Sequence, residues 1–238
     1  MEYREVMRIL KALGRPENVA GMARFEIVVR NAYGVSAPVL KKLAKQIGRD
    51  HALAQQLWRS GNHDARGLAA LIDDPAGVDA RQMESWAKDF DSWAVVDGTC
   101  NNLFRATALA HQKAAEWAER EEEFVKRAGF SLMACLAVHD KDVTDARFLR
   151  YLAIIKREAR DERNFVKKAV NWALRQIGKR NLRLHSEAIQ TATEIHALDS
   201  KAAKWIASDA LRELKSEKVQ QRLRRAASLR RPSLASSR

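Results

Sequence analysis

The sequence has few of the residues that interrupt helices or cross-link chains. Its 238 residues include 4 prolines, 10 glycines and 2 cysteines. So few helix breakers, and no convincing alternation of apolar and polar residues, disfavour strands and predict an almost entirely helical chain. The two cysteines, Cys100 and Cys135, lie within helical patterns. They favour a reducing compartment over a disulfide framework.

Several functional classes lack the sequence features that they require. No apolar run approaches the length of a membrane span, and the N-terminus MEYREVMRIL is too charged for a signal peptide, so we expect a cytoplasmic location. The absence of GxGxxG, a Walker loop and a Gly-x-Ser-x-Gly elbow disfavours nucleotide cofactors and serine hydrolysis. Cys135 and His139 are four apart, but two ligands do not make a metal site. We expect neither a metal nor a cofactor.

Acidic residues are in deficit. There are 43 lysines and arginines against 30 aspartates and glutamates, which gives a net charge of +13. Six arginines and no acid lie within residues 222–238, so this end supplies +6 and the rest of the chain +7. A basic body predicts a polyanionic partner, nucleic acid before an anionic membrane surface. Because a run of one charge is typical of a solvated segment, we expect residues 216–238 to be a basic, flexible tail after a single domain over residues 1–215.

Apolar residues recur at helical spacing along most of the chain. The predicted helices cover residues 2–13, 17–33, 37–47, 50–59, 64–73, 80–90, 92–110, 113–117, 120–138, 144–159, 161–179, 184–195 and 199–214. FVKRAGFSLMA, from Phe124, is echoed by FVKKAVNWALR, from Phe165, which is 41 positions later. That period lies in the range of HEAT-type helical pairs. The expected fold class is an all-α solenoid of HEAT-like repeats with a concave basic groove.

The later of these two helices carries a tryptophan away from its apolar stripe. The stripe consists of Val166, Val170, Ala173 and Ile177. Trp172 lies roughly 140° from its centre, on the side of Lys168, Arg175 and Lys179. On the earlier helix Arg127 has a similar offset, roughly 120°. Since equivalent faces of a solenoid line one surface, we expect Trp172 and Arg127 to point into the same groove.

The segment DFDSWAVVDGTCNNLF, residues 89–104, holds a third unusual position. Trp93 and Asp97 are four apart, on one face of the helix that Asp91 or Ser92 caps. The buried stripe of this helix is expected to be Val96, Cys100, Leu103 and Thr107. Asp97 then lies at the edge of the stripe beside Trp93, where a partly desolvated carboxylate can stabilise a developing cation. The common alternatives are a tryptophan that fills the core, an aspartate that caps a helix and an arginine that is solvated.

Four segments, taken in order, resemble the AlkD-like DNA alkylation repair family. They are GVSAPVLKKLAKQIG (34–48), DFDSWAVVDGTCNNLF (89–104), EEEFVKRAGFSLMACLAVHDKD (121–142) and RNFVKKAVNWALRQIGKRN (163–181). The similarity runs over roughly residues 20–215. It implies HEAT-like repeats that hold duplex DNA in a concave basic cleft. It also implies a DNA glycosylase of base excision repair, a hydrolase that removes N3- and N7-alkylated purines without flipping the base.

The resemblance assigns catalytic roles to three residues. Trp93 and Asp97 match the family's tryptophan and catalytic aspartate, and Trp172 matches its second tryptophan. The chemistry fits these residue types, because an alkylated purine is cationic and its departure leaves an oxocarbenium-like sugar. Asp97 would stabilise that sugar and orient water, and the tryptophans would offer ring faces to the cationic nucleotide.

The resemblance also implies a set of DNA-binding residues. Arg127 matches a DNA-contacting arginine and Arg175 the companion of the second tryptophan, and with Lys168 they would hold flanking phosphates. Phe25 stands where the active member of the family has a tyrosine, so one hydroxyl is missing. The expected partner is double-stranded DNA that contains alkylated bases, and no obligate protein partner is inferred.

Two other functions remain open from the sequence. One is a non-catalytic protein that binds damaged or branched DNA through the same groove, because keeping the fold does not guarantee the chemistry. The other is a HEAT-like scaffold for a protein or RNA, with the basic tail as an anchor. Asp97 separates the glycosylase from both, since pure binding gains nothing from a carboxylate that faces phosphates.

Overall fold

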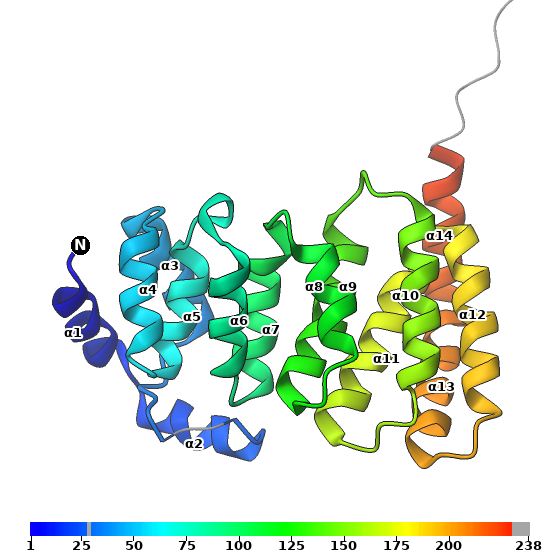
Figure 1. The fold of residues 1–238 in the computed structure, drawn as a ribbon, viewed down its shortest axis with the longest axis horizontal. Coiled ribbons are helices and arrows are strands. Elements are labelled where there is room, and N and C mark those ends of the chain that lie inside the picture. Colours follow the sequence, from blue (N-terminus) through cyan, green and yellow to red (C-terminus); the bar gives the residue numbers. More distant parts are fainter. Residues whose placement is uncertain (28–29, 230–238) are drawn as a thin grey trace, which may run out of the picture. The chain divides into compact units, whose positions relative to one another are not determined.

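The computed structural model describes residues 1–27 and 30–229, and all regular structure in this part of the chain is helical (Figure 1). The predicted all-α class is confirmed. In chain order the elements are α1 (Tyr3–Leu13), α2 (Pro16–Arg24), α3 (Ala37–Ile47), α4 (His51–Arg59), α5 (His63–Ile72), the 3-10 turn η1 (Pro75–Gly77), α6 (Ala80–Lys88), α7 (Trp93–Asn102), the 3-10 turn η2 (Phe104–Ala106), α8 (Ala110–Ala118), α9 (Glu123–His139), α10 (Asp145–Glu158), α11 (Asn164–Gly178), α12 (Leu182–His196), α13 (Lys201–Leu214) and α14 (Glu217–Leu229).

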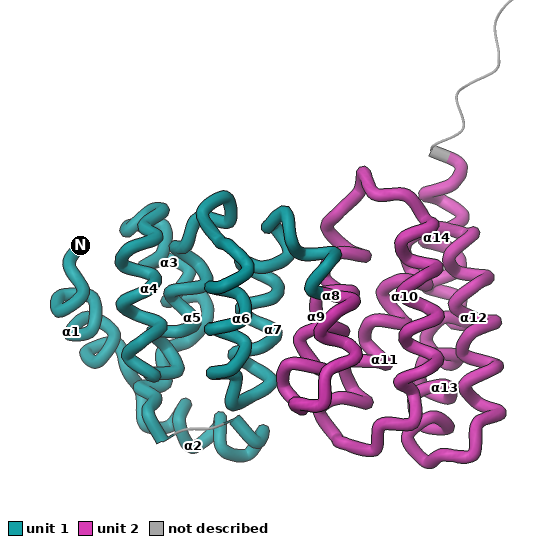
Figure 2. The backbone as a smooth tube through the Cα atoms, in the orientation of Figure 1, with its two compact units in different colours: residues 1–113 teal, residues 114–238 magenta. Residues whose placement is uncertain are grey.

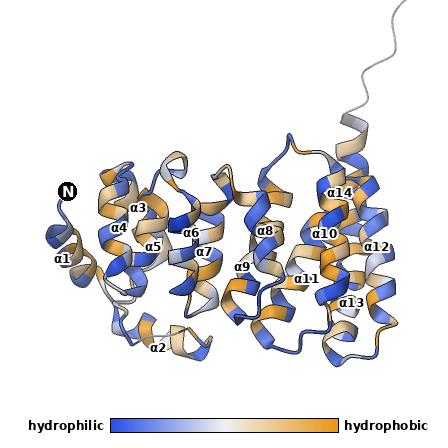
Figure 3. Ribbon diagram, in the orientation of Figure 1, coloured by the Kyte–Doolittle hydropathy of each residue, from blue (hydrophilic) through white to orange (hydrophobic). Residues whose placement is uncertain are grey.

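The chain forms two compact units, unit 1 (Met1–Lys113) and unit 2 (Ala114–Arg238) (Figure 2). Within each unit the helices carry both apolar and polar residues, which Figure 3 shows as orange and blue segments along each ribbon. Amphipathic helices of this kind bury one face against a neighbour and leave the other in water. The single repeat domain predicted over residues 1–215 stays a prediction.

Unit 2 is built from helices that repeat along the sequence. α11 packs against both α9 and α13, while α12 packs against α10 and α14. The rings of Phe124 and Phe165, the residues that revealed the sequence echo, lie 5.5 Å apart between their centroids. Among the described residues, four side-chain pairs join positions 38 apart, namely Arg157 with Glu119, Lys156 with Glu194, Ser200 with Glu162, and Arg175 with Glu213. Equivalent positions of successive helical pairs therefore meet, as stacked HEAT-like repeats require.

Helix α9 is buried along most of its length and on more than one face. Its buried residues include Ala128, Leu132 and Cys135 on one side and Phe130 and Met133 on the opposite side. Gly129 lets this helix approach the end of α8, because a Cβ there would lie 2.3 Å from the backbone nitrogen of Ala118. A helix enclosed in this way buries polar side chains too, and Lys126 pairs with Glu158 at 2.8 Å.

Unit 1 is centred on α5, which packs against α3, α4 and α7. Trp58 and Trp86 stack with their ring centroids 3.9 Å apart and fill the space between α4 and α6. Trp58 is buried and its indole nitrogen donates to Asp89, at 2.9 Å. The buried tryptophan thus satisfies its one polar group.

A buried carboxylate fixes the turn before α3. Asp64, at the start of α5, accepts backbone N–H groups from Tyr33, Gly34 and Val35 at 2.6, 3.2 and 2.8 Å. Gly34 has a φ of 79°, a conformation that residues with a side chain rarely adopt. Asp64 and Gly34 together explain why the chain turns at GVS before the helix begins.

The structure corrects three of the predicted boundaries. α2 ends at Arg24, not at residue 33, and the helix predicted over residues 92–110 breaks after Asn102. Residues 217–229, part of the predicted flexible tail, form α14, which buries Val219 and Leu223 and packs against α12 and α13. The remainder of that tail, residues 230–238, lies outside the described residues. Among the helices that are described, none is long and apolar enough to cross a membrane.

Candidate nucleic-acid interface

The residues predicted to act on DNA belong to both units. Unit 1 contains Phe25, Trp93 and Asp97, and unit 2 contains Arg127, Lys168, Trp172 and Arg175.

Trp93 is the first residue of α7 and is tied to the end of α2. Its indole nitrogen donates to the carbonyl oxygen of Phe25 at 2.8 Å, so the ring is held by a residue 68 positions away. Ser92 occupies the N-cap position, as predicted, but its hydroxyl makes no capping bond. That oxygen is buried and has no hydrogen bond within the described part of the chain. The orientation of Trp93 therefore depends on the Phe25 carbonyl more than on the helix cap.

Asp97 follows Trp93 by one helical turn. The four residues of the predicted stripe, Val96, Cys100, Leu103 and Thr107, are all buried, but only Val96 and Cys100 lie on α7, because the helix ends at Asn102. Asp97 and Trp93 are both half-buried. The carboxylate therefore lies at the border between the core and the surface, on the same helical face as the indole.

Phe25 lies at the C-terminal cap of α2 and is 68% exposed. Its backbone N–H donates to Met22, and the next residue, Glu26, has a φ of 58° and donates to Ala23 at 3.1 Å. A left-handed residue at this position is a common way to end a helix, although glycine is preferred. The turn directs the Phe25 carbonyl to Trp93 and leaves the phenyl ring at the surface.

His63 is a neighbour of this region that the sequence analysis missed. It begins α5, which packs against α7, and burial lowers its pKa, while the carboxylates of Asp64 and Asp91 act in the opposite direction and Arg66 adds to the lowering. His63 is thus biased towards the neutral form near the start of α7. Nothing in the sequence links residue 63 to residue 91, because only the packing of α5 on α7 brings them together.

The six tryptophans divide by their exposure. Trp58, Trp86 and Trp117 are fully buried, Trp93 and Trp172 are half-buried, and Trp205 is 41% exposed. In α11 the predicted stripe of Val166, Val170, Ala173 and Ile177 is confirmed as core. Trp172 thus borders solvent, unlike the three tryptophans that fill the core.

Arg127 does not lie on an open face. It is only 6% exposed, and its Nη1 donates to the carbonyl oxygen of Phe165 at 2.6 Å. The expectation that it points into an open groove is wrong, because α9 is buried on more sides than a single apolar stripe implies. In this structure Arg127 joins two repeats by bonding the first turn of α11.

Arg175 is also engaged within the protein, whereas Lys168 is exposed. The guanidinium of Arg175 bonds to Glu213 of α13 and lies 3.7 Å from Asp209, and Lys179 bonds to the same glutamate. Burial raises the pKa of Glu213, but the hydrogen bonds and charges of Lys179 and Arg175 outweigh this effect, so the pKa lies below its ordinary value. Glu213 therefore already engages both cations within the protein.

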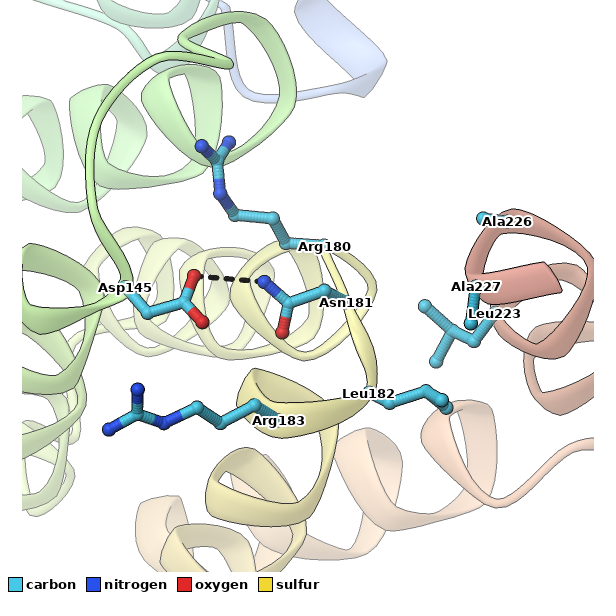
Figure 4. Close-up of a pocket in the computed structure, with 8 residues that line it drawn as sticks. All are labelled: Asp145, Arg180, Asn181, Leu182, Arg183, Leu223, Ala226 and Ala227. Carbon is cyan, nitrogen blue, oxygen red and sulfur yellow. Dashed lines mark hydrogen bonds between the residues drawn. The ribbon is translucent and has the colours of Figure 1, made fainter. Parts of the chain in front are cut away.

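A pocket of about 440 Å³ in unit 2 lies apart from these residues (Figure 4). Asn181 caps α12 and donates to Asp145 at 2.8 Å, and Leu182 points toward Leu223 of α14. None of the predicted DNA-binding residues lines this pocket, which forms where α14 meets the start of α12. Within the described residues, no three histidine, cysteine or acidic side chains are grouped so that they could hold a metal ion.

Comparison with known proteins places the chain in a family. The family model described as DNA alkylation repair enzyme matches residues 6–214. A Listeria innocua protein of uncharacterized function is 25% identical over 166 residues, which are 68% of this chain and 72% of that protein. A solved structure from a new family related to the HEAT-like repeat DNA glycosylases, with affinity for branched DNA structures, matches with a TM-score of 0.76 at 22% identity. The match covers 90% of this chain and 95% of the chain in that structure, and it supports the HEAT-like α-solenoid fold. The chain belongs to the DNA alkylation repair enzyme family.

Proposed function

We propose that this protein is a DNA glycosylase that hydrolyses the N-glycosidic bond of N3- and N7-alkylated purines in duplex DNA, without flipping the base. The observation that supports this most directly is the half-buried carboxylate of Asp97, one turn after the half-buried Trp93 on α7. A carboxylate at the edge of the core is partly desolvated, and it is therefore suited to stabilise a cation.

The reaction needs a group that recognises developing positive charge on the sugar. An alkylated purine is already cationic, so the bond between its nitrogen and C1′ breaks with the electron pair going to the base. The sugar becomes an oxocarbenium ion, and water adds to C1′ and loses a proton. Asp97 stabilises the ion through its charge and orients the water. The products are the free base and an abasic site, and no metal or cofactor takes part.

Trp93 supplies an aromatic face next to the carboxylate. Because its indole nitrogen is held by the Phe25 carbonyl, the ring needs little further ordering when DNA binds. A cationic purine or sugar over such a face gains about 0.5–2 kcal/mol. Phe25 has no hydroxyl, so its part is to hold Trp93 through the backbone and to offer an exposed ring to the DNA.

The residues of unit 2 divide into two roles. Trp172 and Lys168 reach the surface and contact the DNA directly, by stacking and by charge. Arg127 acts indirectly, because it fixes the first turn of α11, on which both of these residues lie. Arg175 contacts phosphate only after it exchanges its bond with Glu213.

The proposal is tested by identifying products. Purified protein is incubated with duplex DNA that carries N3-methyladenine and N7-methylguanine, and the free bases are quantified against a reaction without protein. The proposed function predicts release of at least one of these bases above the spontaneous rate, with an equal number of abasic sites. Release at the spontaneous rate only, from protein that binds the DNA, excludes the glycosylase.

The second candidate is a non-catalytic protein that binds damaged or branched DNA. It is favoured by the engagement of Arg127 and Arg175 within the protein and by the solved relative, whose family is described as having affinity for branched DNA structures. Under this alternative Asp97 opposes binding, so its neutralisation strengthens DNA affinity while base release is absent from the wild type as well.

A further inference from the structure

Helix α13 repeats the surface pattern of α11. In α11 one surface row consists of Lys168, Trp172, Arg175 and Lys179, and at the same spacing α13 has Lys201, Trp205, Ser208 and Arg212. Residues at positions i, i+4, i+7 and i+11 lie on one face of a helix. Since α11 and α13 pack against each other, the two rows belong to neighbouring helices of unit 2. The tryptophan and its cations therefore occur twice, in successive repeats.

The row on α13 is the more accessible of the two. Trp205 is 41% exposed, whereas Trp172 is half-buried. The other members of the α13 row and its flanking lysines are exposed as well, namely Lys201, Lys204, Ser208, Arg212 and Lys215. An indole with this much surface in water is only partly used in packing. Its position between lysines indicates a binding role.

The charge around Trp205 is complementary to a polyanion. The ammonium of Lys167 on α11 lies 5.8 Å from the centroid of the indole. Lys201 and Lys215 make no ion pair within the described part of the chain. The nearby carboxylate of Glu162 is occupied, because it accepts hydrogen bonds from the Ser200 hydroxyl and the Ala202 N–H. Lysine side chains are thus available to phosphate on this face.

The remaining acidic groups on α13 and before it are also paired. Asp209 contacts Arg212 and lies 3.7 Å from the Nε of Arg175, and the exposed Asp199 lies 3.7 Å from Lys204. The Asp199–Lys204 pair is exposed and contributes little to stability, whereas Asp209 is half-buried between its two arginines. The face keeps a net positive charge around a ring.

We propose that the exposed face of α13, centred on Trp205, binds a single-stranded segment of DNA. One base stacks on the indole, and the surrounding lysines hold the phosphates on either side. The strand is unpaired because the bases of a duplex are already stacked on their neighbours, and only an unpaired or terminal base offers its face to a side chain. This inference rests on the proposed DNA-binding function and specifies its substrate, which is duplex DNA adjoining a single-stranded extension.

Two DNA substrates test this inference with the full chain. One is a blunt duplex and the other is the same duplex with a single-stranded extension of ten thymidines, both labelled and measured at one salt concentration. We expect Trp205→Ala to weaken binding of the extended DNA about ten-fold or more and to leave binding of the blunt duplex unchanged. Trp205→Phe keeps an aromatic face and should retain most of the affinity for the extension.

Leu182→Ala is the matched control, since Leu182 is another exposed apolar residue of unit 2 and is 48% exposed. It should bind both DNAs as the wild type does. If Trp205→Ala lowers the thermal midpoint of unfolding, the double variant Lys201→Gln with Lys215→Gln tests the same face without loss of an aromatic ring. This variant should also weaken binding of the extended DNA selectively.

The inference and the proposed function fail in different ways. If Trp205→Ala and the lysine variant bind the extended DNA as tightly as the wild type, the single-strand site is overturned, whatever the rate of base release. Base release from blunt methylated duplex is measured on the same preparations and should be unchanged by Trp205→Ala. If the wild type releases no base, but Trp205→Ala still weakens binding of the extended DNA selectively, the glycosylase is overturned and the single-strand site is supported.

Discussion

Arg127 shows how the surroundings of a single residue decide its role. The offset of roughly 120° from an apolar stripe places a side chain in water only if the helix has one buried face. Helix α9 has more than one, so Arg127 is buried and donates to the Phe165 carbonyl. Trp172 is half-buried at the border of the buried side of α11, and its place in a groove stays a prediction.

We predict that Arg127→Ala lowers the free energy of unfolding by about 1.5–3 kcal/mol, as expected when a charged donor leaves a buried carbonyl unsatisfied. Urea denaturation followed by circular dichroism measures this change. Arg127→Lys keeps the charge but cannot reproduce the geometry of the guanidinium. Its free energy of unfolding should therefore lie between those of the wild type and Arg127→Ala. Unchanged stability combined with weaker DNA binding would return Arg127 to the DNA surface.

Trp172→Ala should affect DNA binding or base release more than stability, the reverse of Arg127→Ala. Because Trp172 borders solvent, we expect a small loss of stability and a loss of about 1–2 kcal/mol in lesion binding or base release, from the lost contact with a cationic nucleotide. Trp58→Ala is the comparison, since Trp58 fills the core and its truncation should destabilise the fold by about 3–5 kcal/mol. Both variants are measured for urea midpoint and base release on one preparation. A large fall in stability for Trp172→Ala with normal release would make the ring a packing residue.

At the scale of helices, Glu213 connects the two repeats that carry Trp172 and Trp205. It bonds to Arg175 and Lys179 of α11 from its place on α13. We predict that Glu213→Gln strengthens DNA binding and steepens its salt dependence, because two cations become available to phosphate. Measured affinities at several salt concentrations give both quantities. Weaker binding would mean that Glu213 holds Arg175 in the orientation that DNA requires.

The same contact has a defined pH dependence. The folded pKa of Glu213 lies below its ordinary value of 4.5, because the bonds from Lys179 and Arg175 outweigh the effect of burial. Its contribution to stability is therefore present above pH 4.5 and is lost as pH falls through the folded pKa. Glu213→Gln should remove this part of the acid-induced loss of stability and leave the rest unchanged.

Much of the helical architecture follows from the sequence, and its errors have physical reasons. The echo at Phe124 and Phe165 correctly indicated stacked repeats, because equivalent residues of successive repeats touch. The break after Asn102 was missed because the apolar pattern continues through Leu103 and Phe104, which are buried just before and at the start of a 3-10 turn. Helix α14 was missed because its arginines mask two apolar residues, Val219 and Leu223, spaced one turn apart.

The candidate site was less predictable than the fold. The sequence placed Trp93 and Asp97 one turn apart on a helix, because that relation is local. It did not predict the bond between Trp93 and Phe25, the neighbouring His63 or the engagement of Arg175 with Glu213, since each depends on which helices pack together. Long-range partners of charged side chains are a property of the folded chain.

For the molecule as a whole, net charge and fold class agree on the partner. A charge of +13 on an α-solenoid that belongs to a DNA alkylation repair family is expected to produce strong, salt-dependent attraction to DNA. This attraction concentrates the protein on DNA without selecting a lesion. Under the proposed function, base release depends on the carboxylate of Asp97, whose negative charge opposes DNA binding. Neutralising Asp97 should therefore lower base release without lowering DNA affinity.

The most direct measurement is therefore the single-turnover rate of base release from methylated duplex DNA, at saturating protein, for the wild type and Asp97→Asn. Asp142→Asn makes the same charge change at an exposed position in unit 2 and serves as the control. We predict a fall of about 100- to 1,000-fold for Asp97→Asn, as for the loss of one preorganised electrostatic group, with DNA affinity equal or slightly higher. Release by Asp97→Asn at the wild-type rate would contradict the proposed catalytic role.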